Sequence, residues 1–105
     1  VQPLAELAAV AHAAGVSFLV EANYAGGWLP VDVQALGIDL LTLAPHRFYG
    51  PKGVGVLYRN RRTRLAPLIH GGSQESGLRA GAENVAGIVG AGVAAEVAGR
   101  ELETR

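Results

Sequence analysis

Three short, mostly apolar runs constrain the fold of this chain more than any other feature of its sequence. They are Val16–Val20, Ile38–Leu43 and Val54–Tyr58. A charged residue follows the first and the last run at once, and His46 and Arg47 follow the second after Ala44 and Pro45. Runs this short favour strands, since helices usually need about ten residues or more. Because polar and apolar residues hardly alternate in the first two runs, these are typical of strands buried on both faces of a parallel sheet.

A helix is predicted before the first strand, over Pro3–Ala14. Apolar residues recur there at helical spacing, at Leu4, Leu7, Ala8 and Ala11. Pro3 suits the first turn of a helix, and Gly15 suits the left-handed residue just past its end.

A closing helix is predicted over Glu83–Leu102. Its apolar side consists of Val85, Ile88, Val89, Val93 and Val97. Glycine lowers helix stability by up to about 1 kcal/mol per residue relative to alanine, and this segment contains Gly87, Gly90, Gly92 and Gly99. We therefore expect the helix to be held by close packing rather than by propensity.

The connecting segments carry weaker signals. Pro30–Leu36 predicts a turn and a short helix that Gly37 ends, and Leu65–Ile69 predicts a short edge strand. A long glycine-rich loop is expected over 70–81.

Strands that alternate with helices predict an α/β fold with a mainly parallel sheet and flanking helices. In such sheets ligands gather beyond the carboxyl ends of the strands. Glu21–Tyr24 and Ala44–Arg47 both follow predicted strands, so we expect these two segments to lie near one another.

The composition argues against several classes of protein. Half of the residues are hydrophobic and the formal net charge is zero, so no nucleic-acid partner is expected. The absence of Cys excludes a disulfide, a thiolate metal site and a Cys nucleophile within the chain. The histidines, His12, His46 and His70, are too scattered to predict a metal site.

No apolar run approaches the roughly 18 residues of a membrane span, and no signal peptide is recognisable. We expect no membrane partner and a cytoplasmic location. The sequence starts at Val1 and has no Met among its 105 residues, which predicts a piece of a longer protein.

Four groups could carry chemistry. Glu21 could pair with a protonated ring nitrogen or an amine, or simply cap nearby amides. His46 and Arg47 could bind a phosphate or carboxylate together, or form a salt bridge beside a solvated imidazole. Lys52 is the only lysine, and therefore the only side chain able to form a Schiff base, but it lies in a predicted turn between Pro51 and Gly53.

Four motifs in this order are familiar. They are L-P-V-D (29–32), G-I-D-L (37–40), H-R-F-Y-G-P-K-G-V-G-V-L-Y (46–58) and H-G-G-S-Q-E-S-G-L-R-A-G (70–81). With them the chain resembles the cysteine desulfurases of the class V aminotransferase group, which depend on pyridoxal phosphate (PLP). The resemblance extends from Pro3 to about Ala98.

The resemblance implies a fold of aspartate-aminotransferase type, with residues 1–105 forming a fragment of the PLP-binding large domain. The parent chain would be incomplete here at both ends. The histidine that stacks on the cofactor would precede Val1, and the Cys-bearing loop and the substrate-binding arginine would follow Arg105. Because the family dimerises, a homodimer or a heterodimer with a homologue is expected.

Several positions that face the cofactor in this family carry different residues here. Glu21 replaces an Asp that pairs with the pyridine nitrogen, and Tyr24 replaces a Gln that bonds the phenolic oxygen. Ala44 replaces a Ser on the phosphate, and Ala82 replaces a Thr that reaches the neighbouring subunit's phosphate. His46, which helps to hold the phosphate, is retained. The resemblance thus implies an altered cofactor site.

Arg47 stands at the position of the family's Schiff-base lysine, whereas Lys52 matches a separate lysine of the G-P-K-G turn. A guanidinium stays protonated and cannot replace the free amine that an imine requires. We therefore expect a non-catalytic chain, in which covalent PLP attachment is not supported. Two alternatives stay open: part of an active desulfurase that moves sulfur from cysteine to a persulfide, and a structural or regulatory subunit paired with an active homologue.

Overall fold

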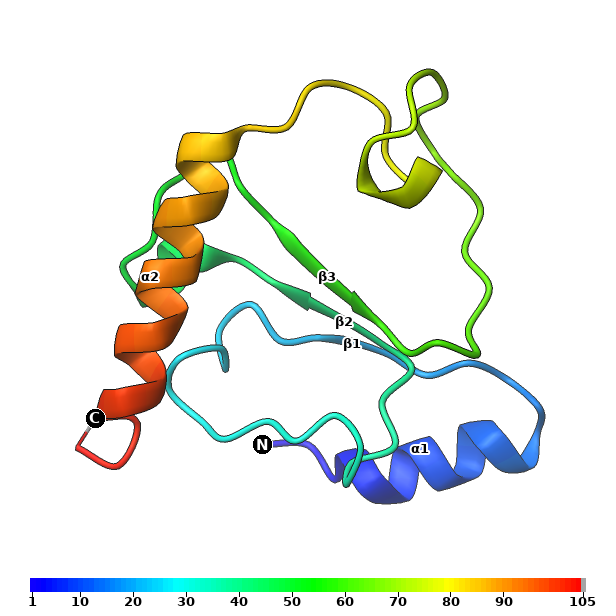
Figure 1. Cartoon of the computed structure of the whole chain (residues 1–105). Helices are drawn as coiled ribbons and strands as arrows, with labels where there is room; N and C mark the ends of the chain where they lie inside the picture. Colours follow the sequence, from blue (N-terminus) through cyan, green and yellow to red (C-terminus); the bar gives the residue numbers. More distant parts are fainter. Residues whose placement is uncertain (105) are drawn as a thin grey trace.

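A computed structural model describes residues 1–104 and shows helices around a small three-stranded sheet (Figure 1). The elements in chain order are α1 (Leu4–Ala13), β1 (Leu19–Glu21), β2 (Leu40–Leu43), η1 (Pro45–Phe48), β3 (Val56–Arg59), η2 (Glu75–Gly77) and α2 (Val85–Glu101), where η denotes a 3-10 helix. None of the helices in this part of the chain has both the length and the apolar character needed to cross a membrane.

The sheet has the order β1-β2-β3 and confirms the α/β fold class. β1 and β2 pair in parallel, with Val20 opposite Leu41, whereas β2 and β3 pair antiparallel, with Leu41 opposite Tyr58. The antiparallel pair follows from the connection, because the chain turns back through η1 and the 49–55 segment without a crossover helix. The sheet is thus mixed within the described residues.

The strands are shorter than the apolar runs that predict them, and two are shifted toward the carboxyl side. β1 begins only at Leu19 and includes Glu21, and β3 ends at Arg59. The prediction of helix α1 is confirmed, and Gly15 beyond its end has the expected left-handed conformation, with φ of 68°. Residues 16–18 lie outside β1, so that run does not form the full strand, although the carbonyl of Phe18 accepts hydrogen bonds from the amides of Asp39 and Leu40.

The core lies on one face of the sheet. Val20, Leu41 and Tyr58 face it in register, and Ala22 and Ile38 complete it. On the opposite face Leu19 is 54% exposed and Leu57 49% exposed. The expectation that the first strands are buried on both faces is therefore wrong for the described residues. Side chains from α1 and from the segment 25–36 pack on the core face, whereas α2 packs against η1 and leaves the opposite face of the strands exposed.

Two predicted elements are absent from residues 1–104. The segment 30–37 forms turns instead of a short helix, held by Asp32, whose carboxylate accepts hydrogen bonds from the backbone amides of Gln34 and Ala35. The segment 65–69 contributes only one bridge, between Ile69 and Arg79, and not an edge strand.

The closing helix is confirmed as α2, but the prediction of its buried side is wrong. Its buried residues are Gly87, Ala91 and Ala98, whereas the branched residues named above are exposed, from 37% at Val97 to 66% at Val85. Asn84 caps the helix by accepting a hydrogen bond from the Gly87 amide at 3.1 Å. The small residues face the protein because they let the helix backbone approach closely.

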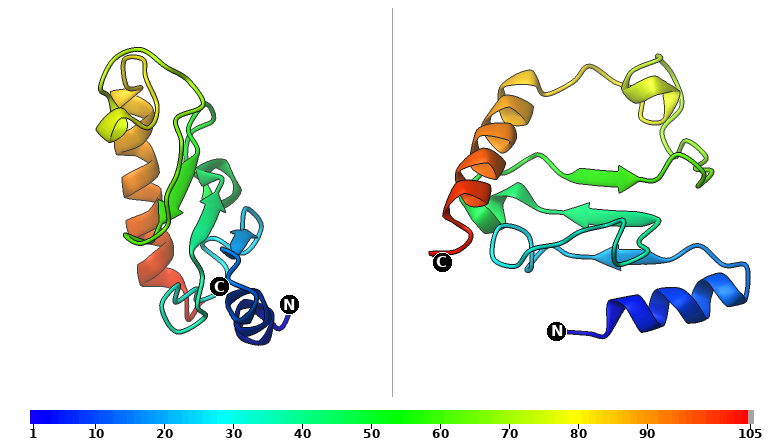
Figure 2. Two further views of the ribbon diagram at one scale, coloured as in Figure 1. Left: turned by 90° about the vertical axis from the view of Figure 1, so that its right-hand side faces the viewer. Right: turned by 60° about the horizontal axis from the view of Figure 1, so that its bottom comes forward.

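Helix α2 lies against η1 and the segment between η1 and β3, while α1 lies on the other side of the sheet (Figure 2). A Cβ added at Gly87 would come within 2.5 Å of Val54, and one at Gly90 would come within 3.1 Å of Pro51. Ala98, near the other end of α2, packs near Phe48 beside Gly27. The helix therefore packs against η1, the segment that contains His46 and Arg47, and holds it in place.

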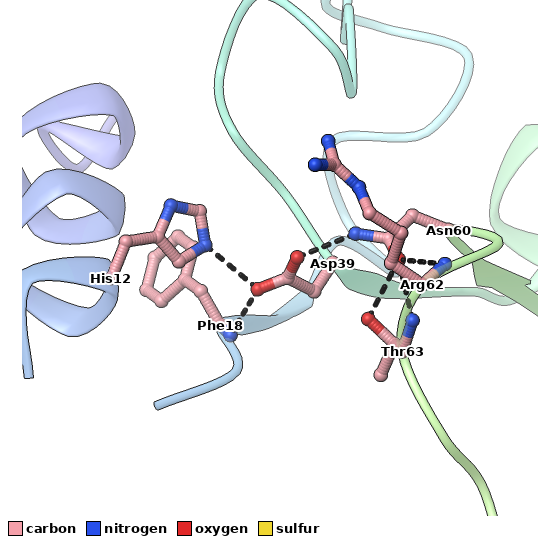
Figure 3. A network of polar contacts seen from close by, with 6 residues as sticks. All are labelled: His12, Phe18, Asp39, Asn60, Arg62 and Thr63. Atoms are coloured by element: carbon pink, nitrogen blue, oxygen red, sulfur yellow. Dashed lines mark hydrogen bonds and ion pairs between the residues drawn. The ribbon is translucent and has the colours of Figure 1, made fainter. Parts of the chain in front are cut away.

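At the opposite end of β2, Asp39 joins several elements (Figure 3). Its carboxylate accepts hydrogen bonds from the Phe18 amide at 2.8 Å, His12 Nε2 at 2.8 Å and Asn60 Nδ2 at 2.5 Å. Asn60 in turn accepts hydrogen bonds from the amide and hydroxyl of Thr63. The pKa of Asp39 lies below its ordinary value of 3.8, chiefly because of the Phe18 amide and then because of His12.

Candidate functional site

The segments that follow β1 and β2 lie side by side, as the sequence predicts. Glu21 is paired with Thr42 across the parallel strands, and the amide of Ala22 donates to the carbonyl of Thr42 at 3.0 Å. The chain then enters η1 at the buried Pro45, whose fixed φ suits the start of a helix. Parallel pairing thus brings the two polar segments to the same edge of the sheet.

Arg47 contacts Tyr24, which is the central feature of this site. Arg47 Nη2 donates to the Tyr24 hydroxyl at 2.8 Å, and its Cζ lies 4.2 Å from the centroid of the Tyr24 ring. Both side chains are exposed, with Tyr24 at 70%. Tyr24 and Arg47, both of which the resemblance implies to be substituted, therefore interact with each other through a hydrogen bond and a cation–π contact.

Two aromatic residues that the sequence analysis did not single out also belong to the site. Trp28 Nε1 donates to the carbonyl of Arg47 at 3.1 Å, and the rings of Trp28 and Tyr49 lie 6.2 Å apart. Tyr49 ends η1 in a left-handed conformation with φ of 69°, which is uncommon for a residue other than glycine. Tyr49 lies two positions after Arg47 in the sequence, whereas Trp28 lies 19 positions before it, so no sequence signal indicated that Trp28 belongs to the site.

Glu21 is exposed and turns back onto its own segment. One of its carboxylate oxygens accepts a hydrogen bond from the amide of Asn23 at 2.9 Å. This geometry agrees with the simpler interpretation of Glu21 as a carboxylate that caps nearby amides.

His46 and Ala44 line an open hollow of about 510 Å³ beside β2 and β3. Its polar lining consists of Asn23, Thr42 and His46, and its apolar wall includes Val54, Val56 and Leu57. Arg47 is not among its lining residues, since its side chain extends toward Tyr24. The two neighbouring residues of the H-R pair are therefore oriented differently.

Lys52 and Ala82 lie apart from this contact. Lys52 is exposed in the turn before Gly53, and Ala82 is exposed in the segment that leads into α2. Within residues 1–104 no hydrogen bond or ion pair joins either of them to Glu21, Tyr24, His46 or Arg47. The structure brings together the candidates after β1 and β2 but not these two.

The chemistry of the side chains present does not fit covalently attached PLP. The side chain at position 47 offers a guanidinium, which has no free amine to form an imine, and it is already bonded to Tyr24. His46, Asn23 and Thr42 can still donate hydrogen bonds to a ligand in the hollow.

The sequence matches the family described as aminotransferase class-V over residues 1–104. It is 50% identical to the cysteine desulfurase IscS of Dictyoglomus turgidum over 103 residues, which are 98% of this chain and 26% of that protein. It is 48% identical to the cysteine desulfurase NifS of Azotobacter vinelandii over 101 residues, 96% of this chain and 25% of that protein. The chain thus spans about a quarter of the length of these relatives.

Solved structures of similar proteins have the same fold as this chain. A NifS-like protein from Rickettsia africae superposes with a TM-score of 0.93 at 29% identity, over 97% of this chain and 28% of that one. A structure described as SspA in complex with cysteine superposes with a TM-score of 0.85 at 45% identity, over 91% of this chain and 28% of that one. Both the sequence and the fold therefore match cysteine desulfurases and proteins like them.

Proposed function

Because the chain belongs to the aminotransferase class-V family, we propose that it is part of the PLP-binding large domain of a cysteine-desulfurase-like protein that lacks covalent cofactor chemistry. It is then a pseudoenzyme segment within a longer parent chain. The coverage of about a quarter of each relative supports the larger parent, and the expected cytoplasmic location belongs to the same proposal.

The observation that carries this proposal is Arg47. It occupies the position at which the family is expected to bear its reactive lysine, and it cannot supply a free amine. Its contact with Tyr24, a position that the resemblance also implies to be substituted, supports the proposal, because the guanidinium has a partner within the structure. Lys52, the only lysine, is exposed in a turn next to Pro51, which packs near Gly90 of α2.

Reduction with borohydride tests the proposal. The parent chain is mixed with PLP, reduced, digested and analysed by mass spectrometry, with Lys52→Arg and Arg47→Lys variants alongside. We expect no specific adduct on this segment of the wild type and an adduct at position 47 in the Arg47→Lys variant. A stoichiometric adduct at Lys52 of the wild type, lost in Lys52→Arg, contradicts the proposal.

An active cysteine desulfurase is the second candidate. It is favoured by the high identity to proteins of that name and by the retained His46. In that case the parent chain moves sulfur from cysteine to a persulfide, the reaction for which PLP supplies an electron sink when bound. Sulfide release is compared between the parent chain and its Arg47→Lys form. Our proposal expects activity only in Arg47→Lys, and equal activity in both overturns it.

A structural or regulatory subunit is the third candidate. It is favoured by the exposed branched side of α2 and by the exposed face of the sheet, both of which a partner could cover. The partner would be a second copy or an active homologue. Co-purification of the parent chain with a tagged active homologue supports this candidate, and a strictly monomeric parent chain argues against it.

A further inference from the structure

The contact between Tyr24 and Arg47 holds a positive charge in two ways. The hydroxyl of Tyr24 accepts a hydrogen bond from Nη2 of Arg47 at 2.8 Å, and the guanidinium lies over the phenol ring, with Cζ 4.2 Å from the ring centroid. Both interactions are stronger for a charged group than for a neutral one. Tyr24 therefore favours a cation at position 47, whichever side chain carries the charge.

Arg47 has no carboxylate partner within residues 1–104. The ion pairs in this part of the chain are His12 with Asp39 and Arg100 with Glu96. Glu21 lies at the same edge of the sheet as the segment after β2, but its carboxylate accepts a hydrogen bond from the Asn23 amide. The favourable environment of the guanidinium therefore comes from Tyr24 and not from an acidic side chain.

The side chain at position 47 is directed away from the hollow beside β2 and β3. Trp28 Nε1 donates to the carbonyl of Arg47 at 3.1 Å, and the Arg47 side chain extends to Tyr24. His46 lines the hollow, whereas Arg47 does not. A lysine at position 47 would start from the same backbone, and its flexible four-carbon stem would let its ammonium reach the same ring and hydroxyl.

We propose that Tyr24 is a positioning residue that holds a cation at position 47, so that Tyr24 and Arg47 together, and not Arg47 alone, exclude free-amine chemistry there. The inference rests on the proposed function, to which it adds a second residue. Replacing Arg47 by lysine then restores an amine, but an amine that Tyr24 keeps protonated.

Protonation matters because only a neutral amine has the lone pair that attacks a carbonyl carbon. Tyr24 is exposed, and a cation–π contact at an exposed site changes an equilibrium about threefold. Tyr24 should therefore lower the neutral fraction of an amine at position 47, and with it the rate of reaction with an aldehyde, by about threefold.

Reductive methylation of the parent chain tests this inference without PLP. The neutral amine adds to formaldehyde, water is lost, and cyanoborohydride supplies the hydride that reduces the C=N bond. Arg47→Lys and Arg47→Lys/Tyr24→Leu are treated with limiting reagent at neutral pH, and mass spectrometry gives methylation at position 47 relative to Lys52. Lys52 is exposed in a turn and serves as the internal control. We expect this ratio to be about threefold higher in the double variant.

Further variants separate the two interactions. Combined with Arg47→Lys, Tyr24→Phe keeps the ring but removes the acceptor, and Tyr24→Gln keeps an acceptor but removes the ring. Each is expected to give a ratio between those of the first two proteins. Alkaline pH should abolish the differences, because the amine is then neutral with or without Tyr24. A merely structural effect of Tyr24→Leu on access to position 47 would persist at alkaline pH.

Two results overturn the inference: a methylation ratio that does not change when Tyr24 is replaced, or a change that persists at alkaline pH. Both are distinct from failure of the proposed function, because formaldehyde labels amines whether or not the chain binds PLP. A stoichiometric PLP adduct at Lys52 of the wild type refutes the proposed function, whereas an unchanged methylation ratio refutes only the role of Tyr24.

Discussion

The two ends of strand β2 differ in how they are held. At the amino end, Asp39 is 14% exposed and accepts hydrogen bonds from three segments: helix α1, the residue before β1 and the residue after β3. At the carboxyl end, Arg47 is exposed and its side chain donates a hydrogen bond to an exposed tyrosine. The first end holds the strands together, and the second carries exposed polar side chains.

Under the proposed function, this difference accounts for a family scaffold that persists while its chemical residues change. Substitution at the Arg47 end leaves the hydrogen bonds around Asp39 untouched, because no residue is shared between the two sets of contacts. The Arg47 end is positioned by packing of η1 against α2 instead.

Removal of the Asp39 carboxylate is expected to have the largest effect. Asp39→Ala should lower the free energy of unfolding by about 3 kcal/mol, because the Phe18 amide and the Asn60 side chain lose their acceptor in a partly buried place. Urea denaturation followed by circular dichroism measures this loss. Glu21→Ala, at the other end of the sheet, is the control and should cost less than about 1 kcal/mol. If Asp39→Ala and Glu21→Ala lower the free energy of unfolding equally, the two ends of the sheet do not differ in their contribution to stability.

A methyl group at Gly87 should disturb the packing that positions the Arg47 end. Gly87→Ala is expected to destabilise the protein by about 1–2 kcal/mol, because the new Cβ would come within 2.5 Å of Val54. Gly92→Ala is the matched control, since nothing lies within 4 Å of its Cβ, and it should stabilise by up to about 1 kcal/mol. Thermal denaturation measures both changes. If Gly87→Ala also stabilises the protein, Gly87 of α2 does not pack against Val54 as described.

Acid should weaken the Asp39 end specifically. The folded pKa of Asp39 is below the ordinary 3.8, so its stabilisation is complete above that value and is lost as pH falls through the folded pKa. Unfolding free energies of the wild type and Asp39→Asn are compared from about pH 6 down to about pH 3. The difference between the two proteins should shrink toward the acid end. If the difference in unfolding free energy between the two proteins stays constant with pH, the Asp39 carboxylate is not the group whose protonation weakens this end.

The Tyr24–Arg47 contact should contribute least to stability. A double-mutant cycle with Tyr24→Phe and Arg47→Gln should give a coupling free energy below about 1 kcal/mol, as is usual for exposed cation–π and hydrogen-bonded pairs. Chemical denaturation of the four proteins measures it. A coupling as large as the effect of Asp39→Ala would mean that both ends of β2 are structural.

The sequence by itself determined the helices at both ends of the chain, the α/β class and the family. Pro3 and Gly15 bracket α1 through local backbone preferences, and the H-R-F-Y-G-P-K-G motif carries the resemblance. It also determined that position 47 bears a guanidinium, because amine chemistry depends only on the identity of the side chain. These properties are local, so no knowledge of distant contacts was needed.

Only the tertiary structure decided which surfaces meet. Periodicity predicted that the branched residues of α2 face the protein, but its glycines and alanines do. Small side chains let the helix backbone lie close to η1 and the segment after it, and this packing leaves the larger apolar side chains exposed. Asp39 joins residues 21 and 27 positions away, and Arg47 meets a tyrosine 23 positions earlier. Such contacts arise because parallel pairing aligns the ends of β1 and β2. The order of residues along the sequence does not show which distant residues this pairing brings together.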